Sequence, residues 1–252
     1  MFARLLSGFL FFVMAQSLWA DTLHVAVAAN FTRPMQALAE VFETRSGHHL
    51  ELSFGSSGQL FAQIQNGAPF DVFLSADEAK PTALIESGSA VADSQFTYAV
   101  GALALWSATP HRFSDAEALL RSGDFNRLAV ANPRLAPYGE AAMEVLEKLR
   151  LTEAVQNKTV QGQNIAQTHQ FVATGNADIG FVALSQILQD GRVEEGTGWI
   201  VPSQYYSPIR QDAVLLNRAA DNPAARELLA YLRSEDAAIL IEHFGYRLEA
   251  SL

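Results

Sequence analysis

Short apolar runs alternate with amphipathic segments along most of the chain. Residues 23–28 form an apolar run typical of a buried strand, and apolar residues then recur within residues 35–42 at the i, i+3, i+4, i+7 spacing of one helix face. The same order returns twice, at residues 50–54 with 60–64 and at residues 72–74 with 78–86. Strands that alternate with helices across short Gly- and Ser-containing turns predict an α/β fold with mainly parallel sheets flanked by helices.

A second strand–helix series follows a long apolar run at residues 98–106. Its strands are predicted at residues 128–131, around 160, at 179–182, 199–201 and 212–216, and its helices at residues 137–149, 165–173, 223–233 and 235–244. Extended apolar segments, rather than a polar linker, connect the two series. We therefore predict two lobes joined by two crossover strands, with residues 21–102 and 212–252 in the first lobe and 103–211 in the second. A ligand cleft is expected between such lobes.

The first 20 residues have the pattern of a secretory signal peptide. Arg4 precedes a short apolar run over residues 5–13, and small residues surround a cleavage position after Ala20. The run is too short to span a bilayer, which takes about 20 apolar residues. We expect an exported protein that is cleaved near Ala20, and an uncleaved N-terminal anchor is the alternative.

Composition narrows the chemistry of the 252-residue chain. It has no cysteine, which excludes disulfides and thiolate chemistry, and its six histidines show no metal-binding spacing, so we expect no direct cation site. The 17 Lys and Arg residues stand against 27 Asp and Glu, for a net charge of −10. Nucleic acid is a poor partner for this balance, because phosphate contacts need clustered basic residues. An anionic ligand would need a local site to attract it.

Small, mostly neutral residues occupy the turns that lead from predicted strands into helices. The turns are residues 28–30, 55–58, 75–77, 137–139 and 164–165. Ligands of open α/β sheets bind at the carboxyl ends of strands, and each helix N-terminus offers unpaired N–H groups with about half a positive charge. Several such ends that converge on one point would make an oxyanion site without Lys or Arg.

Two other kinds of chemistry are weighed against this one. Ser57 lies in a Gly-Ser-Ser-Gly turn, but Gln59 stands where the G-x-S-x-G motif of hydrolases requires Gly, so a secreted hydrolase that uses Ser57 is the less favoured alternative. A helix cap explains this turn as well as a binding role does. Three aspartates flank strands, and capping or turn formation is preferred for them over acid–base work: Asp71, Asp77 and Asp178.

Six motifs follow one another in a recognisable order. They are AVAANFT, FGSSGQLFAQIQNGAPFDVFLSAD, NPRLAPYG, GQNIAQ, ADIGFVALSQI and YYSPI. In this order the chain resembles the periplasmic molybdate-binding proteins of ABC importers, over nearly all residues after residue 20, and the second motif is the most specific. The resemblance implies the two-lobed type II periplasmic-binding-protein fold and a periplasmic, monomeric receptor. It also implies molybdate or tungstate as ligand, a membrane permease as partner, no cofactor and no catalysis.

The resemblance also implies where the ligand is held. Its contacts fall on four positions, Asn30, Ser57, Tyr138 and Ile165, with Ala29 and Ser56 as adjacent candidates. Asn30 stands where many family members have Ser. Ala183 stands where many have a ligand-contacting Tyr, so the Tyr138 hydroxyl is a candidate replacement from the opposite wall.

A pocket of neutral donors suits this ligand. Molybdate carries no proton near neutral pH and only accepts hydrogen bonds, whereas protonated phosphate also needs an acceptor. Neutral donors avoid the desolvation of a buried cation, which costs several kcal/mol. Sulfate has the same charge as molybdate and shorter bonds, so a receptor for sulfate is an alternative that cavity size must exclude. A regulatory effector domain of this fold would need N-terminal DNA-binding helices, where this chain has the signal-peptide pattern.

Overall fold

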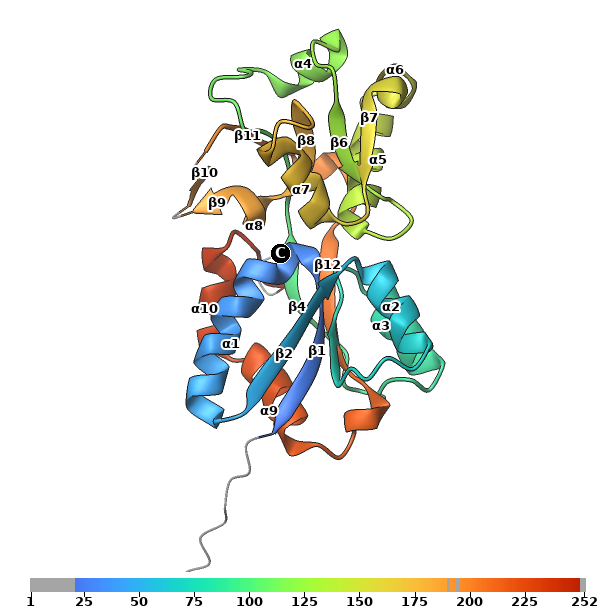
Figure 1. Cartoon of the computed structure of the whole chain (residues 1–252), viewed down its shortest axis with the longest axis vertical. Helices are drawn as coiled ribbons and strands as arrows, with labels where there is room; N and C mark the ends of the chain where they lie inside the picture. The colour runs from blue at the N-terminus through green and yellow to red at the C-terminus, as the bar shows by residue number, and fades with distance from the viewer. Residues whose placement is uncertain (1–20, 190, 194, 250–252) are drawn as a thin grey trace, which may run out of the picture.

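The computed structural model describes residues 21–189, 191–193 and 195–249, so the predicted signal peptide lies outside the described residues. The chain forms two five-stranded sheets, which lie one above the other along the long axis of Figure 1. The first sheet has the order β2 (His49–Gly55), β1 (Thr22–Ala28), β3 (Val72–Leu74), β12 (Ile209–Leu215), β4 (Phe96–Gly101). The second has the order β11 (Thr197–Ile200), β5 (Leu103–Ser107), β8 (Ile179–Ala183), β6 (Leu128–Ala131), β7 (Thr159–Gly162). First lobe and second lobe denote the parts built on these sheets.

Helices cover both faces of each sheet. One face of the first sheet packs on α1 (Thr32–Ser46), α9 (Pro223–Leu232) and α10 (Glu235–His243), and the other on α2 (Ser57–Gln65) and α3 (Ala79–Glu86). The second sheet packs on α4 (Ala116–Ser122), α5 (Pro137–Lys148) and α6 (Thr152–Val155) on one side, and on α7 (Ile165–Ala173) and α8 (Leu184–Ile187) on the other. Strands buried on both faces read as continuous apolar runs, which is why β1 and β3 are visible in the sequence.

The strand pairing is more mixed than the alternation of strands and helices predicts. β1 pairs in parallel with β2 and β3, and β6 pairs in parallel with β7 and β8. β12 runs antiparallel between β3 and β4, and β5 runs antiparallel between β8 and β11. A small antiparallel pair, β9 (Leu188–Gln189) with β10 (Arg192–Val193), also follows α8. Within the two large sheets, the chain passes from one lobe to the other between antiparallel strands, from β4 to β5 and from β11 to β12.

The chain crosses between the sheets twice. The apolar run at residues 98–106, predicted as one strand, is divided at Ala102 into β4 of the first sheet and β5 of the second. The chain returns through β12, which belongs to the first sheet from Ile209 on, ahead of the predicted boundary at residue 212. Gly101 ends β4 where a Cβ atom would stand 2.1 Å from the Tyr138 hydroxyl, so the first crossover needs a residue without a side chain. Among the described residues, no helix is both long and apolar enough to cross a membrane.

Candidate functional site

A small pocket lies between the two lobes, next to the crossovers. Its first-lobe wall comes from the turns after β1, β2 and β3, and its second-lobe wall from the starts of α5 and α7. The pocket is narrow, with a cavity volume of about 10 Å³, roughly the room that a single water molecule needs. All six predicted residues line it, together with others that share small size or neutrality: Ala28, Ala29, Asn30, Gly55, Ser56, Ser57, Ala76, Ala136, Pro137, Tyr138, Asn164 and Ile165.

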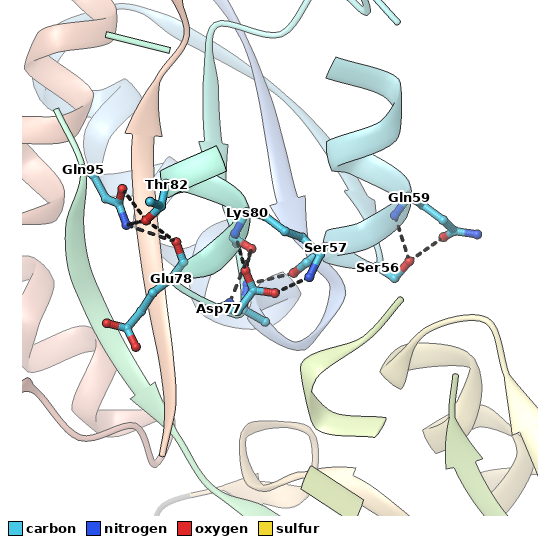
Figure 2. A network of polar contacts seen from close by, with 10 residues as sticks. Ser56, Ser57, Gln59, Asp77, Glu78, Lys80, Thr82 and Gln95 are labelled. Atoms are coloured by element: carbon cyan, nitrogen blue, oxygen red, sulfur yellow. Dashed lines mark hydrogen bonds and ion pairs between the residues drawn. The ribbon is translucent and has the colours of Figure 1, made fainter. Parts of the chain in front are cut away.

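The two serines at the start of α2 have different roles (Figure 2). Ser56 is the N-cap: its Oγ accepts a hydrogen bond from the Gln59 N–H at 3.3 Å and donates to Gln59 Oε1 at 3.0 Å. Ser57 is buried, and its Oγ accepts the Ala76 N–H at 2.8 Å. A hydroxyl has one hydrogen to donate, so the Ser57 hydroxyl keeps its donor for the pocket. The predicted cap and the predicted binding group are therefore neighbouring residues.

Asn30 is held by its side chain and its carbonyl group. Its Nδ2 donates to Gln211 Oε1 at 2.7 Å and to the Tyr246 hydroxyl at 3.0 Å. Its carbonyl oxygen accepts from Ser185 Oγ at 3.0 Å and from the Tyr246 hydroxyl at 2.9 Å. The two bonds that Nδ2 donates engage both hydrogens of the side-chain amide. The donor that Asn30 can offer an anion is its main-chain N–H, in the short 3-10 helix that follows β1 (Ala29–Phe31).

Tyr138 is tied to the crossover strand. Its hydroxyl accepts a hydrogen bond from Gln211 Nε2 at 3.1 Å, and Gln211, on β12, is fully buried. Gln211 therefore links Asn30 of the first lobe to Tyr138 of the second. Burial, reinforced by Tyr246, raises the pKa of Tyr138 well above its ordinary value, so the hydroxyl stays protonated at neutral pH. The replacement of the family's Tyr at position 183 by Tyr138 stays a prediction; Ala183 itself is buried at the end of β8.

The second-lobe wall consists of two helix starts. Pro137 occupies the first position of α5, where a missing N–H costs nothing, and Gly139 lies so close to β6 that a Cβ would stand 2.2 Å from the Ala131 carbonyl oxygen. Asn164 caps α7, because its side chain accepts the Gln167 N–H at 2.9 Å. The N–H groups of Tyr138 and Ile165 fall in these first turns, where the helix itself supplies no acceptor.

The pocket has no charged side chain among the described residues that line it. The starts of α2, α5 and α7 supply the positive potential instead, each with about half a positive charge. Nearby Asp77 is paired with Lys80, an ion pair that Figure 2 shows next to Ser57. Within the described part of the chain, no group of His, Asp or Glu side chains could hold a metal ion. With main-chain N–H and hydroxyl donors from both lobes and no charged side chain in its described lining, the arrangement suits an oxyanion.

The aspartates have the structural roles preferred for them. Asp71 Oδ2 accepts the His24 N–H at 2.8 Å, and its Oδ1 contacts Arg218 Nε at 3.2 Å. Asp178 Oδ2 accepts two main-chain N–H groups, those of Asn126 and Arg127. These bonds fix turns and strand ends.

Three polar residues behind the pocket were missed by sequence reasoning: Ser185, Gln211 and Tyr246. Gln211 lies next to a predicted strand, and Tyr246 follows the last predicted helix. The hydrogen-bond partners of these three residues are far away in the sequence, so local patterns do not reveal the contacts. A polar residue within an apolar segment near a strand crossing is the signal that could have pointed to them.

The fold and its uncharged interlobe pocket define a solute-binding protein. Residues 23–247 match the family described as bacterial extracellular solute-binding protein, and the chain belongs to this family. The predicted type II periplasmic-binding-protein fold is confirmed by this match and by the solved structure described next.

Named relatives narrow the class. The molybdate-binding protein ModA of Azotobacter vinelandii is 53% identical, with 94% of each chain covered. ModA of Rhodobacter capsulatus is 48% identical, with 90% of this chain and 88% of its own covered. The structure of a periplasmic molybdate-binding protein of Azotobacter vinelandii has a TM-score of 0.87 at 39% identity, with 90% of this chain and 99% of that chain covered. The resemblance inferred from the six motifs is thus confirmed.

Proposed function

We propose that this protein is an exported receptor that binds molybdate or tungstate between its lobes and delivers it to the membrane permease of an ABC importer. The observation that carries the proposal is the pocket itself: six residues expected from the motifs converge on one small cavity lined by neutral groups. The 53% identity to a molybdate-binding protein over nearly the full chain supports the same ligand.

Four groups are proposed to hold the anion. The Ser57 hydroxyl donates directly, since its oxygen is already occupied by the Ala76 N–H. The main-chain N–H groups of Asn30, Tyr138 and Ile165 donate from the starts of helical segments. Hydrogen bonds to a charged acceptor contribute about 1.5–3 kcal/mol each, so four such donors give a strong site without a cation.

Closure of the lobes around the anion is the proposed conformational step. Donors come from both lobes, so the anion completes its hydrogen bonds only when the walls approach. The closed form then presents a surface of both lobes to the permease. We further propose that the protein acts as a periplasmic monomer after cleavage near Ala20.

Binding without catalysis fits the pocket better than hydrolysis. Among the described residues that line it, none is a His, Asp, Glu or Lys that could take the proton of Ser57. Ser57 also lacks the Gly required two residues later by the hydrolase motif.

A thermal-shift series tests the proposed function. The exported protein is heated with molybdate, tungstate, sulfate or phosphate, each at the same concentration, set to a thousand times the dissociation constant of molybdate, where molybdate stabilises by roughly 4 kcal/mol. For a chain of this size we expect Tm to rise by about 8–16 °C with molybdate and tungstate. A comparable rise with sulfate alone would favour the sulfate receptor, and no rise with molybdate or tungstate would refute the proposed ligand.

A further inference from the structure

Two residues at the edge of the pocket join the lobes directly. The N–H of Gly58, in the first turn of α2, donates to the carbonyl oxygen of Leu135 at 2.9 Å. Leu135 lies in the turn that leads from β6 to α5. Each is next in sequence to a pocket residue, Ser57 on one side and Ala136 on the other. The bond therefore closes the cleft immediately beside the proposed anion site.

The absence of a side chain at Gly58 allows this contact. A Cβ atom there would stand 2.9 Å from the Leu135 Cα and 3.1 Å from its carbonyl oxygen. Both atoms belong to the backbone, so a rotation of the Leu135 side chain cannot relieve the conflict. Gly58 is helical and is not among the glycines with positive φ, so its own backbone conformation does not require glycine. Alanine would stabilise the helix better than glycine does. The close approach of the second lobe therefore accounts for glycine at this position.

The bond depends on the relative position of the lobes. Gly58 and Leu135 belong to different lobes, and neither lies in a crossover segment. Separation of the lobes about the crossovers must break the bond and expose both groups to water. A contact that exists only in the closed arrangement shifts the population toward that arrangement, and a ligand that needs both walls then binds more tightly.

We propose that Gly58 is a positioning residue for anion capture: its N–H and its missing side chain let the two walls lock together beside the anion and so slow anion release. This inference deepens the proposed function and rests on it. This role also explains why the Gly-Ser-Ser-Gly turn ends in a glycine. Neither the capping by Ser56 nor the hydrogen bond of Ser57 requires glycine at position 58.

The test compares Gly58→Ala with the wild-type exported protein. Calorimetry gives the dissociation constants for molybdate, tungstate and sulfate, stopped-flow mixing gives the rate constants, and thermal unfolding without ligand gives the stability. We expect Gly58→Ala to retain or raise the ligand-free Tm, because Ala is the better helix former. We expect its molybdate affinity to fall by about tenfold or more, mainly through faster dissociation. Gly58→Val, with a larger side chain at the same contact, should lose more affinity.

Gln63→Ala is the matched control, since Gln63 lies exposed on the same helix. It should change neither affinity nor dissociation rate. If Gly58→Ala binds and releases molybdate as the wild type does, the inference is refuted. If the wild type binds sulfate instead of molybdate, the proposed ligand is wrong, while the loss of sulfate affinity in Gly58→Ala would still support the contact. A wild type that binds none of the three anions overturns both proposals.

Discussion

The two walls of the pocket hold the same proposed ligand by different means. The first-lobe wall contributes a side-chain hydroxyl, that of Ser57, and an asparagine whose amide is engaged in a buried network. The second-lobe wall contributes main-chain N–H groups at two helix starts, while its polar side chains serve other purposes: Asn164 caps α7, and the Tyr138 hydroxyl bonds Gln211. The first wall thus offers a side-chain donor beside the main-chain N–H of Asn30, whereas the second wall offers main-chain donors alone.

This difference decides how each wall responds to mutation. A side-chain donor can be deleted by one substitution, with little change in the fold around it. A backbone donor persists whatever the side chain, so it can only be moved by changing the packing or the cap that positions it. The largest effects on binding should therefore come from substitutions in the second lobe that never touch the anion.

Gly139→Ala should have the largest effect. Its Cβ would stand 2.2 Å from the Ala131 carbonyl oxygen, so α5 must move away from β6 and carry the Tyr138 N–H with it. We expect a loss of about 3 kcal/mol in stability from overpacking, and a roughly hundredfold loss in molybdate affinity. Unfolding and calorimetry measure both, with the exposed Glu147→Ala on the same helix as control. Normal affinity in Gly139→Ala would show that the second wall tolerates displacement of α5.

Ser57→Ala should weaken molybdate binding by roughly 1–3 kcal/mol, because a charged acceptor loses one donor. Ser56→Ala provides the comparison, since it removes the cap of α2 and costs about 1 kcal/mol of stability, with a smaller loss of affinity. Titration calorimetry on both variants gives the contrast. Equal losses of affinity would remove the distinction between the two serines.

Asn164→Ala should act on the second wall through the start of α7. The loss of the cap costs about 1 kcal/mol of stability, and a less ordered first turn should reduce molybdate affinity several-fold through the Ile165 N–H. Asn164→Ser retains a capping oxygen and should restore most of the affinity. If the serine variant binds no better than the alanine variant, the Asn164 side chain acts by some route other than the cap.

Substitution of His169 should have the smallest effect, and this effect should appear only in the dependence of stability on pH. Burial, reinforced by Arg33, lowers its pKa below the ordinary value, and its ring stacks on Trp106 at 4.8 Å. Below about pH 6.5 the unfolded chain takes up a proton that folded His169 resists, so stability falls as pH falls. His169→Phe keeps the stacking without the titration. Between pH 7.5 and 5.5 its Tm should fall by less than that of the wild type. Identical pH profiles would refute this role.

Local patterns predicted much of the fold, because the central strands are buried on both faces. The run at residues 72–74 is β3 itself, and Ile165–Ala173 is α7. The run at residues 98–106 shows the limit of such reasoning. Its two halves are equally apolar because both are core strands, so hydrophobicity does not reveal that the chain changes sheets at Ala102.

The residues of the pocket also fall into those that local sequence patterns predict and those that they do not. Ser57 and Ile165 could be predicted because helix starts are local features with recognisable residues. The network behind Asn30 could not, since Gln211 lies 181 residues and Tyr246 lies 216 residues away along the chain. Such partners become neighbours only when the last strand and the C-terminal segment return to the first lobe. Motif order supplied the ligand class, and three-dimensional packing supplied the support of its donors.

The position of β12 also sets an order of folding. All strands of the second sheet come from one continuous stretch, so that lobe can complete its sheet once residue 200 is available. The first sheet has β12 between β3 and β4, although β12 follows the entire second lobe in the sequence. When the chain is synthesised from its N-terminus, the first lobe therefore completes its sheet after the second lobe does. Until β12 is in place, β3 and β4 have unpaired edges that can pair with strands of other chains.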